Sequence, residues 1–285
     1  MSSKLPDFLV IGGMRCGSTT LHNVLSFHPQ LFVPEQKELH YFDGYNADIF
    51  PNIEEYKKVF QNAGSHQLCG EITPDYLTTP SALKNISNIF QELKIVVILR
   101  EPVARVCSHY LMSCATGFEV LPFDKAIESE QTRLLNRNKI ADIFHSYKER
   151  STYLPRLEKY AERFGRHNIH VIFLEELNKT PSRELAGLWS FLEVDNLPEA
   201  ALEDLVKPSN KNEDMFYQNR TMIFRIWHFC LHKLGLKANF VRKKPFIRLE
   251  DKQILSESFN EHNLELSQWL GRELPWAVDT LDKTQ

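Results

Sequence analysis

The chain has 285 residues, of which 42% are hydrophobic and 25% are charged, and its formal net charge is −3. This composition is typical of a globular protein with one large core, and its mildly acidic balance argues against a nucleic-acid partner. The five cysteines form no close CxxC pair, which argues against a disulfide framework or a zinc site. The first apolar run is too short for a signal peptide or a membrane span, so we expect a cytoplasmic protein.

Strand and helix patterns alternate along the chain. We predict a strand over 8–12, a helix over 18–27, a strand over 67–72, a helix near 80–92 and a buried strand over 94–99. Then follow a helix that Pro102 opens and Gly117 ends, a long helix over 146–164, a strand over 169–174, and helices over 180–192, 198–206 and 249–270. This alternation predicts an α/β fold of three layers, a central parallel sheet flanked by helices, in a single domain over residues 1–285.

A glycine-rich loop follows the first predicted strand. Gly12 and Gly17 have the spacing of the phosphate-binding P-loop, GxxxxGK(S/T), but Ser18 stands where that motif has lysine, and the cation of the loop is Arg15. Backbone N–H groups of such a P-loop-like turn, together with the start of the next helix, bind an anion without a charged side chain. The glycines alone favour the alternative, an ordinary strand-to-helix turn that Ser18 caps.

A second candidate anion site follows the buried strand over 94–99. Ligands of parallel sheets collect beyond the carboxyl ends of the strands, and Arg100 is the first residue after this strand. A guanidinium there can hold a phosphate through two hydrogen bonds, and Ser108, on the following helix, can turn its hydroxyl to the same anion. The alternative is that Arg100 pairs with a carboxylate and that Ser108 faces water.

Three motifs resemble the sulfotransferases that use 3′-phosphoadenosine 5′-phosphosulfate (PAPS). Residues 15–19 (RCGST) are similar to KxGTT, and residues 99–110 match every fixed position of LRxPxxRxxSxY. Residues 37–43 (KELHYFD) resemble the KExHFFD segment of the heparan-sulfate and carbohydrate branch of that family. Weaker likeness continues through Tyr153 and 169–174 to Trp276, so the resemblance covers most of the chain.

The resemblance implies that PAPS is the sulfuryl donor and that no metal is needed. Arg15 stands in the place of a lysine that neutralises charge on the leaving oxygen. The resemblance also places Cys16, Gly17 and Tyr153 in the donor site and assigns Ser18, Thr19 and Thr20 to the 5′-phosphate and Arg100 and Ser108 to the 3′-phosphate. Lys207 and Lys211 lie where relatives have a loop that closes over the donor, so the resemblance implies that they bind its phosphates; a charged exposed loop is the alternative.

Glu38 and His40 are the candidate catalytic groups on the acceptor side. They are two residues apart, so in an extended segment both side chains point the same way, and either the carboxylate takes the acceptor proton or it orients a histidine that does. A surface Lys-Glu pair beside a packed histidine is the alternative. The resemblance implies that Glu38 is the general base ahead of His40. Asp43 is expected to orient its surroundings or contact the acceptor.

Two features depart from the family pattern or lie outside it. Ile72 stands where many relatives carry a second lysine. Residues 222–244 are apolar and aromatic with a basic end, which favours a core-packing helix; peripheral membrane contact is the alternative.

The acceptor that the resemblance implies is a hydroxyl or amine of a carbohydrate, glycolipid or small molecule.

Two other functions remain open. A P-loop nucleotide kinase or NTPase needs the missing lysine and a carboxylate at the strand end, where this chain has Arg100. A non-catalytic protein that binds PAPS or its product, 3′-phosphoadenosine 5′-phosphate (PAP), is consistent with Arg15 and Ile72. The lumenal domain of a Golgi enzyme without its anchor is the alternative to a cytoplasmic location.

Overall fold

A computed structural model describes residues 4–135, 139–206 and 245–276, and the chain divides into two compact units. The first unit comprises Met1–Glu101, Tyr153–Ser209 and Leu266–Gln285, and the second comprises Pro102–Thr152 and Asn210–Glu265. Each unit is described by itself below. That the chain is one domain stays a prediction.

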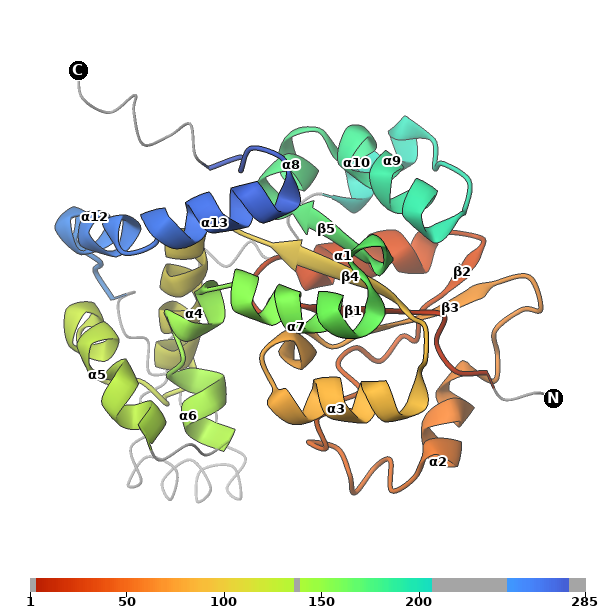
Figure 1. Ribbon diagram of the computed structural model, residues 1–285, viewed down its shortest axis with the longest axis horizontal. Helices are drawn as coiled ribbons and strands as arrows, with labels where there is room; N and C mark the ends of the chain where they lie inside the picture. The colour runs from red at the N-terminus through yellow and green to blue at the C-terminus, as the bar shows by residue number, and fades with distance from the viewer. Residues whose placement is uncertain (1–3, 136–138, 207–244, 277–285) are drawn as a thin grey trace, which may run out of the picture. The chain divides into compact units, whose positions relative to one another are not determined.

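The first unit contains a five-stranded sheet in which every described strand pairing is parallel. Its strands carry the labels β1 to β5 in Figure 1. The strand order is β2-β3-β1-β4-β5. The strands are β1 (Phe8–Gly12), β2 (Leu31–Phe32), β3 (Leu68–Ile72), β4 (Lys94–Leu99) and β5 (Ile169–Phe173). After β1 the chain continues to β2 on one side of the sheet, and after β4 it continues to β5 on the other side. The carboxyl ends of the adjacent strands β1 and β4 therefore form the switch point at which such sheets bind ligands.

Helices cover both faces of this sheet, because its strands alternate side chains between two apolar clusters. Phe8 and Val10 of β1 face the cluster that contains residues of four helices: α1 (Ser18–Phe27), α8 (Leu174–Lys179), α9 (Pro181–Leu192) and α10 (Glu199–Leu205). Leu9 and Ile11 face the opposite cluster, with residues of α2 (Ile53–Lys57), α3 (Pro80–Ile89) and α7 (Leu154–Phe164). This layering confirms the predicted α/β fold.

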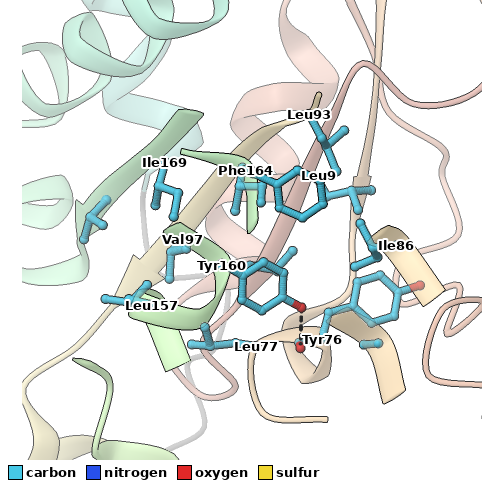
Figure 2. Close-up of a cluster of buried hydrophobic side chains, with 14 of the residues drawn as sticks. Leu9, Tyr76, Leu77, Ile86, Leu93, Val97, Leu157, Tyr160, Phe164 and Ile169 are labelled. Atoms are coloured by element: carbon cyan, nitrogen blue, oxygen red, sulfur yellow. Dashed lines mark hydrogen bonds between the residues drawn. The ribbon is translucent and has the colours of Figure 1, made fainter. Parts of the chain in front are cut away.

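Figure 2 shows part of the cluster on the α3 and α7 face. Leu9 of β1 and Val97 of β4 pack there with Ile86 of α3 and Leu157 of α7. The Tyr160 hydroxyl donates a hydrogen bond to the Tyr76 carbonyl oxygen (2.8 Å), which satisfies both polar groups inside this cluster. The cluster therefore anchors the turn after β3 to α7.

The second unit has a helical core of its own. Its described helices are α4 (Pro102–Ala115), α5 (Phe123–Leu135), α6 (Lys139–Phe144), α12 (Leu249–Glu257) and the first half of α13 (Asn260–Leu270). Arg105, a fixed residue of the second motif, is fully buried and donates from Nε to Ser151 Oγ (2.5 Å) and from Nη2 to the Tyr147 carbonyl. This arginine therefore ties α4 to the turn before Thr152.

Two predicted helices are wrong in extent. Residues 146–164 do not form one helix: a short 3-10 turn covers Glu149–Ser151, and α7 begins at Leu154 because Pro155 is tolerated only in the first turn of a helix. Residues 249–270 form α12 and α13 instead of one helix. The Phe259 N–H bonds to Ser256 three residues back, and this tighter turn directs Phe259 into the apolar core of the second unit.

Candidate active site

The loop between β1 and α1 is built around Gly17. The Gly13 N–H donates to the Ile98 carbonyl on β4 (2.6 Å), and the Cys16 N–H donates back to Gly13 (3.2 Å), which closes the turn. Gly17 has a φ of 94°, and a Cβ on it would lie 2.5 Å from Leu174 Cδ1. Only glycine fits this backbone conformation and this space without strain.

The first turn of α1 gathers the hydroxyls that the sequence predicts for the 5′-phosphate. Ser18 and Thr20 are buried and Thr19 is exposed, and α1 has no acidic side chain in its first turn. A helix N-terminus carries a partial positive charge and N–H groups that point along the helix axis. The loop and α1 therefore make an N-terminal anion site of the kind that binds phosphate.

The Arg100 guanidinium contacts the backbone of Arg15 in this loop. Arg100 Nη1 donates to the Arg15 carbonyl oxygen (3.3 Å), and the Tyr153 hydroxyl donates to the Arg100 carbonyl oxygen (2.8 Å). Burial lowers the pKa of the Arg15 guanidinium, and the positive charge of Arg100 lowers it further. Like charges held together in this way favour binding of an anion. The structure thus brings together Arg15, Arg100 and Tyr153, three of the predicted donor residues.

Three predicted donor residues lie in the second unit or outside the described residues. Ser108 lies half-buried on α4, in the second unit, so its pairing with Arg100 stays a prediction. Lys207, Lys211 and residues 222–244, for which the sequence favours a core-packing helix and peripheral membrane contact is the alternative, lie outside the described residues.

The acceptor-side motif, residues 37–43, forms a segment that we call the strap. Lys37 at its start donates from Nζ to Thr19 Oγ1 on α1 (2.9 Å), and the Glu38 N–H donates to the Ile72 carbonyl at the end of β3 (2.9 Å). Burial lowers the pKa of the Lys37 ammonium, and the nearby Glu38 carboxylate (3.9 Å) opposes that change. The strap therefore adjoins the loop that follows β1.

The strap is not extended, which corrects the predicted geometry of Glu38 and His40. Both residues have left-handed backbone conformations, with φ values of 58° and 55°. The Glu38 side chain is exposed, whereas His40 Nδ1 bonds to the buried Asp43 carboxylate (2.6 Å). Burial acts to lower the pKa of His40, but the hydrogen bond and charge of Asp43, with smaller contributions from Asp75 and Glu38, raise it above its ordinary value.

Lys37 is a residue of the site that is not predicted from the sequence, although it is the first residue of the third motif. Its one signal was that position, and a lysine next to a glutamate is usually a surface pair. Ile72, the departure from the family pattern, is buried in the apolar cluster that contains Cys16. Ile72 thus supplies no charge at this site, whereas Lys37 of the strap brings a cation to Thr19 at the start of α1.

The family is decided by the match of the chain to a sequence profile. The profile described as "Sulfotransferase domain" matches residues 5–229. The chain belongs to the sulfotransferase domain family. This confirms the resemblance seen in the three motifs.

Sequence relatives include eukaryotic sulfotransferases. The membrane-associated sulfotransferase kil1 of Dictyostelium discoideum is 38% identical over 112 residues, which is 38% of this chain and 23% of that protein. Human heparan sulfate glucosamine 3-O-sulfotransferase 3B1 is 25% identical over 284 residues, 96% of this chain and 66% of that protein. Mouse heparan sulfate glucosamine 3-O-sulfotransferase 5 is 27% identical over 281 residues, 96% of this chain and 74% of that protein. The chain thus spans less than two thirds of the length of the first two proteins.

Solved sulfotransferase structures share the fold. The enzyme from Alicyclobacillus acidocaldarius aligns with a TM-score of 0.67 at 21% identity, over 95% of this chain and 98% of that one. Mouse sulfotransferase SULT7A1, complexed with PAP, aligns with a TM-score of 0.53 at 15% identity, over 93% of this chain and 87% of that one. These alignments confirm the predicted fold class.

A membrane-spanning helix and a group of metal ligands are both absent from the described residues. Within the described part of the chain, no helix has the length and apolar character that crossing a bilayer requires. Among the same residues, no three His, Cys, Asp or Glu side chains are grouped as metal ligands, and independence from metal stays a prediction.

Proposed function

We propose that this chain transfers a sulfuryl group from PAPS to a hydroxyl or amine of a carbohydrate-type acceptor, with Glu38 as the general base. The observation that carries the proposal is the 2.9 Å hydrogen bond from Lys37 to Thr19. It holds the strap, and with it Glu38, against the loop and helix start that form the anion site. A candidate base and a candidate phosphosulfate site are thus neighbours in one unit.

The residues of the loop fit the donor. The start of α1 and its hydroxyls suit a 5′-phosphate, and Arg15, Arg100 and Lys37 supply positive charge for a polyanion. When bound, PAPS supplies the sulfuryl group: an acceptor oxygen or nitrogen bonds to sulfur, the bond from sulfur to the bridging phosphate oxygen breaks, and PAP leaves.

The residues of the chain have distinct tasks in this proposal. Glu38, whose carboxylate is exposed, accepts the proton that the acceptor group loses. Arg15 and Lys37 neutralise the negative charge that gathers on the leaving side. The carbohydrate class of the acceptor rests on the heparan sulfate relatives. The proposal for the donor rests on family membership and on the residues around the loop.

The first experiment measures the donor site. We expect calorimetry to give tighter binding of PAP than of ATP, and we expect Arg100→Ala to remove that preference, since Arg100 is assigned to the 3′-phosphate. Arg248→Ala, which removes an exposed arginine of the second unit, is the matched control and should change neither affinity. ATP binding that is as tight as PAP binding and depends on Mg²⁺ would overturn the proposal in favour of a P-loop kinase.

The second experiment measures chemistry. With PAPS and a panel of neutral and sulfated oligosaccharides, Glu38→Gln should lower kcat by about 10²- to 10⁴-fold, the range of general acid-base catalysis, and leave the Kd for PAP unchanged. Wild-type protein that binds PAP but sulfates none of these acceptors would point to a non-catalytic PAP- or PAPS-binding protein. A Glu38→Gln variant with wild-type kcat would remove Glu38 as the base.

A further inference from the structure

The strap contains two residues in a backbone conformation that side chains usually disfavour. Glu38 and His40 are not glycine, yet their φ values are 58° and 55°. Non-glycine residues adopt this left-handed region rarely, and they keep it only where surrounding structure holds them there. The groups that hold the strap are therefore part of what places Glu38 and His40.

Two hydroxyls from the end of β3 and the turn after it bind the strap backbone. The Tyr76 hydroxyl accepts hydrogen bonds from the Tyr41 N–H (3.0 Å) and the Phe42 N–H (3.3 Å). Thr73 Oγ1 accepts a longer one from the His40 N–H (3.5 Å). Three consecutive N–H groups of the strap are thus held by side chains instead of by a neighbouring strand.

The Glu71 carboxylate sets the direction of both hydroxyls. Glu71, on β3, is 1% exposed, and its Oε1 accepts hydrogen bonds from Thr73 Oγ1 (2.7 Å) and from the Tyr76 hydroxyl (2.7 Å). A hydroxyl has one proton and two lone pairs, so a hydroxyl that donates to Glu71 presents its lone pairs elsewhere. For Tyr76 both lone pairs meet strap N–H groups. Burial, and next the charge of Glu71, raise the pKa of the Tyr76 hydroxyl well above its ordinary value, so the proton stays on it at neutral pH.

We propose that Glu71, Thr73 and Tyr76 are positioning residues that clamp the strap, and so hold Glu38 and His40 at the donor loop. The hydrogen bonds of the clamp hold the strap whether or not the chain catalyses sulfuryl transfer. Its consequence for turnover rests on the proposed function, because it acts through the base.

Tyr56 provides a matched control for Tyr76. Both rings are buried and both pack against Phe42, with ring centroids 5.3 and 5.5 Å from it. Both hydroxyls donate to Glu71, Tyr56 to Oε2 (2.5 Å) and Tyr76 to Oε1. The difference is that the Tyr76 hydroxyl also accepts the strap N–H groups. Tyr56→Phe and Tyr76→Phe therefore remove equivalent groups and only one of them opens the clamp.

The experiment compares amide hydrogen exchange and steady-state kinetics of the full chain with Tyr76→Phe or Tyr56→Phe. Loss of a backbone hydrogen bond should speed exchange at residues 41 and 42 by about tenfold in Tyr76→Phe, and by less than about threefold in Tyr56→Phe. In Tyr76→Phe, kcat should fall by about tenfold or more while the KM for PAPS stays within about threefold. Thr73→Val should speed exchange at residue 40, and Thr73→Ser, which keeps the hydroxyl, should not.

The outcomes separate the clamp from the proposed function. Equal exchange at residues 41 and 42 in the two Tyr→Phe variants, or an equal fall of kcat in both, would overturn the clamp. If Tyr76→Phe does not fold, the Thr73→Val and Thr73→Ser pair decides the same question at residue 40. If the wild-type chain sulfates no acceptor, the proposed function fails, and the exchange measurements still decide whether the hydroxyls hold the strap.

Discussion

Replacing Lys37 with methionine tests whether this lysine belongs to the donor site. Lys37 Nζ donates to Thr19 Oγ1 at 2.9 Å, and its side chain is 20% exposed, much less than that of a lysine fully in solvent. Methionine keeps the length and apolar stem of the side chain and removes the charge. The variant therefore isolates the ammonium group.

The expected effect on PAP binding is the loss of one hydrogen bond from the Lys37 ammonium to the phosphosulfate. A hydrogen bond to a charged group contributes about 1.5–3 kcal/mol, which corresponds to about 10- to 150-fold in a dissociation constant. The Lys37–Glu38 distance of 3.9 Å gives an attraction of about 1–4 kcal/mol for effective dielectric constants of about 80 to 20. Because Glu38 is largely exposed, we place that attraction at the lower end. Without Lys37, the negative charge of Glu38 also repels the phosphosulfate.

The assay is calorimetric titration of Lys37→Met with PAP, at low and at high salt. Lys57→Met is the matched control, because Lys57 is 22% exposed and also pairs with a glutamate, Glu54, at 2.8 Å. We expect the Kd for PAP to rise about 10- to 150-fold in Lys37→Met and to stay unchanged in Lys57→Met, with a smaller difference at high salt. Equal affinities of the two variants would refute the reasoning and make Lys37 an ordinary surface lysine.

Two further predictions concern stability. Gly17→Ala should lower the free energy of unfolding by about 1–2 kcal/mol because of the left-handed φ, and by about 1–3 kcal/mol more because the new Cβ contacts Leu174. Urea titrations of the single and double variants should show that Leu174→Ala recovers the loss due to that contact, and a coupling energy near zero between the two substitutions would contradict this. Asp43 favours the protonated form of His40 and so raises the pKa of His40 in the folded state. The stability that this interaction adds to the fold is therefore fully present below the unfolded pKa of about 6.5, and it is lost as pH rises through the folded pKa. Urea titrations from acid to alkaline pH should therefore give a stability difference between wild type and His40→Gln that shrinks as pH rises, whereas a constant difference would argue against the Asp43 bond.

The central strands and the first helix can be predicted from sequence because local signals coincide there. The strand β4 is an unbroken apolar run followed by Arg100, and the predicted range 94–99 equals the observed one. Helix α1 begins after Gly17 and ends before Pro29, and its predicted range is also the observed one. Where a single proline or a buried aromatic residue decides the boundary, as at Pro155 and Phe259, the periodic pattern alone gives a helix that is too long.

The candidate site is predictable in part, for a similar reason. Arg15 and Arg100 follow strands of a parallel sheet, so their meeting is expected from sheet geometry alone. The contact between Lys37 and Thr19 and the clamp at Glu71 join residues from segments whose approach only the folded core determines. The available signal for the clamp was a carboxylate in an otherwise apolar strand.

At the two left-handed positions of the strap, a substitution that raises thermostability is expected to lower turnover. Positions with positive φ are where glycine substitution is most favourable, so a search for stabilising changes would rank Glu38→Gly and His40→Gly highly. Those two substitutions would relax the backbone while deleting the groups assigned to the acceptor side. A heat-resistant version of this chain should therefore be sought in other parts of the molecule, with these two positions left unchanged.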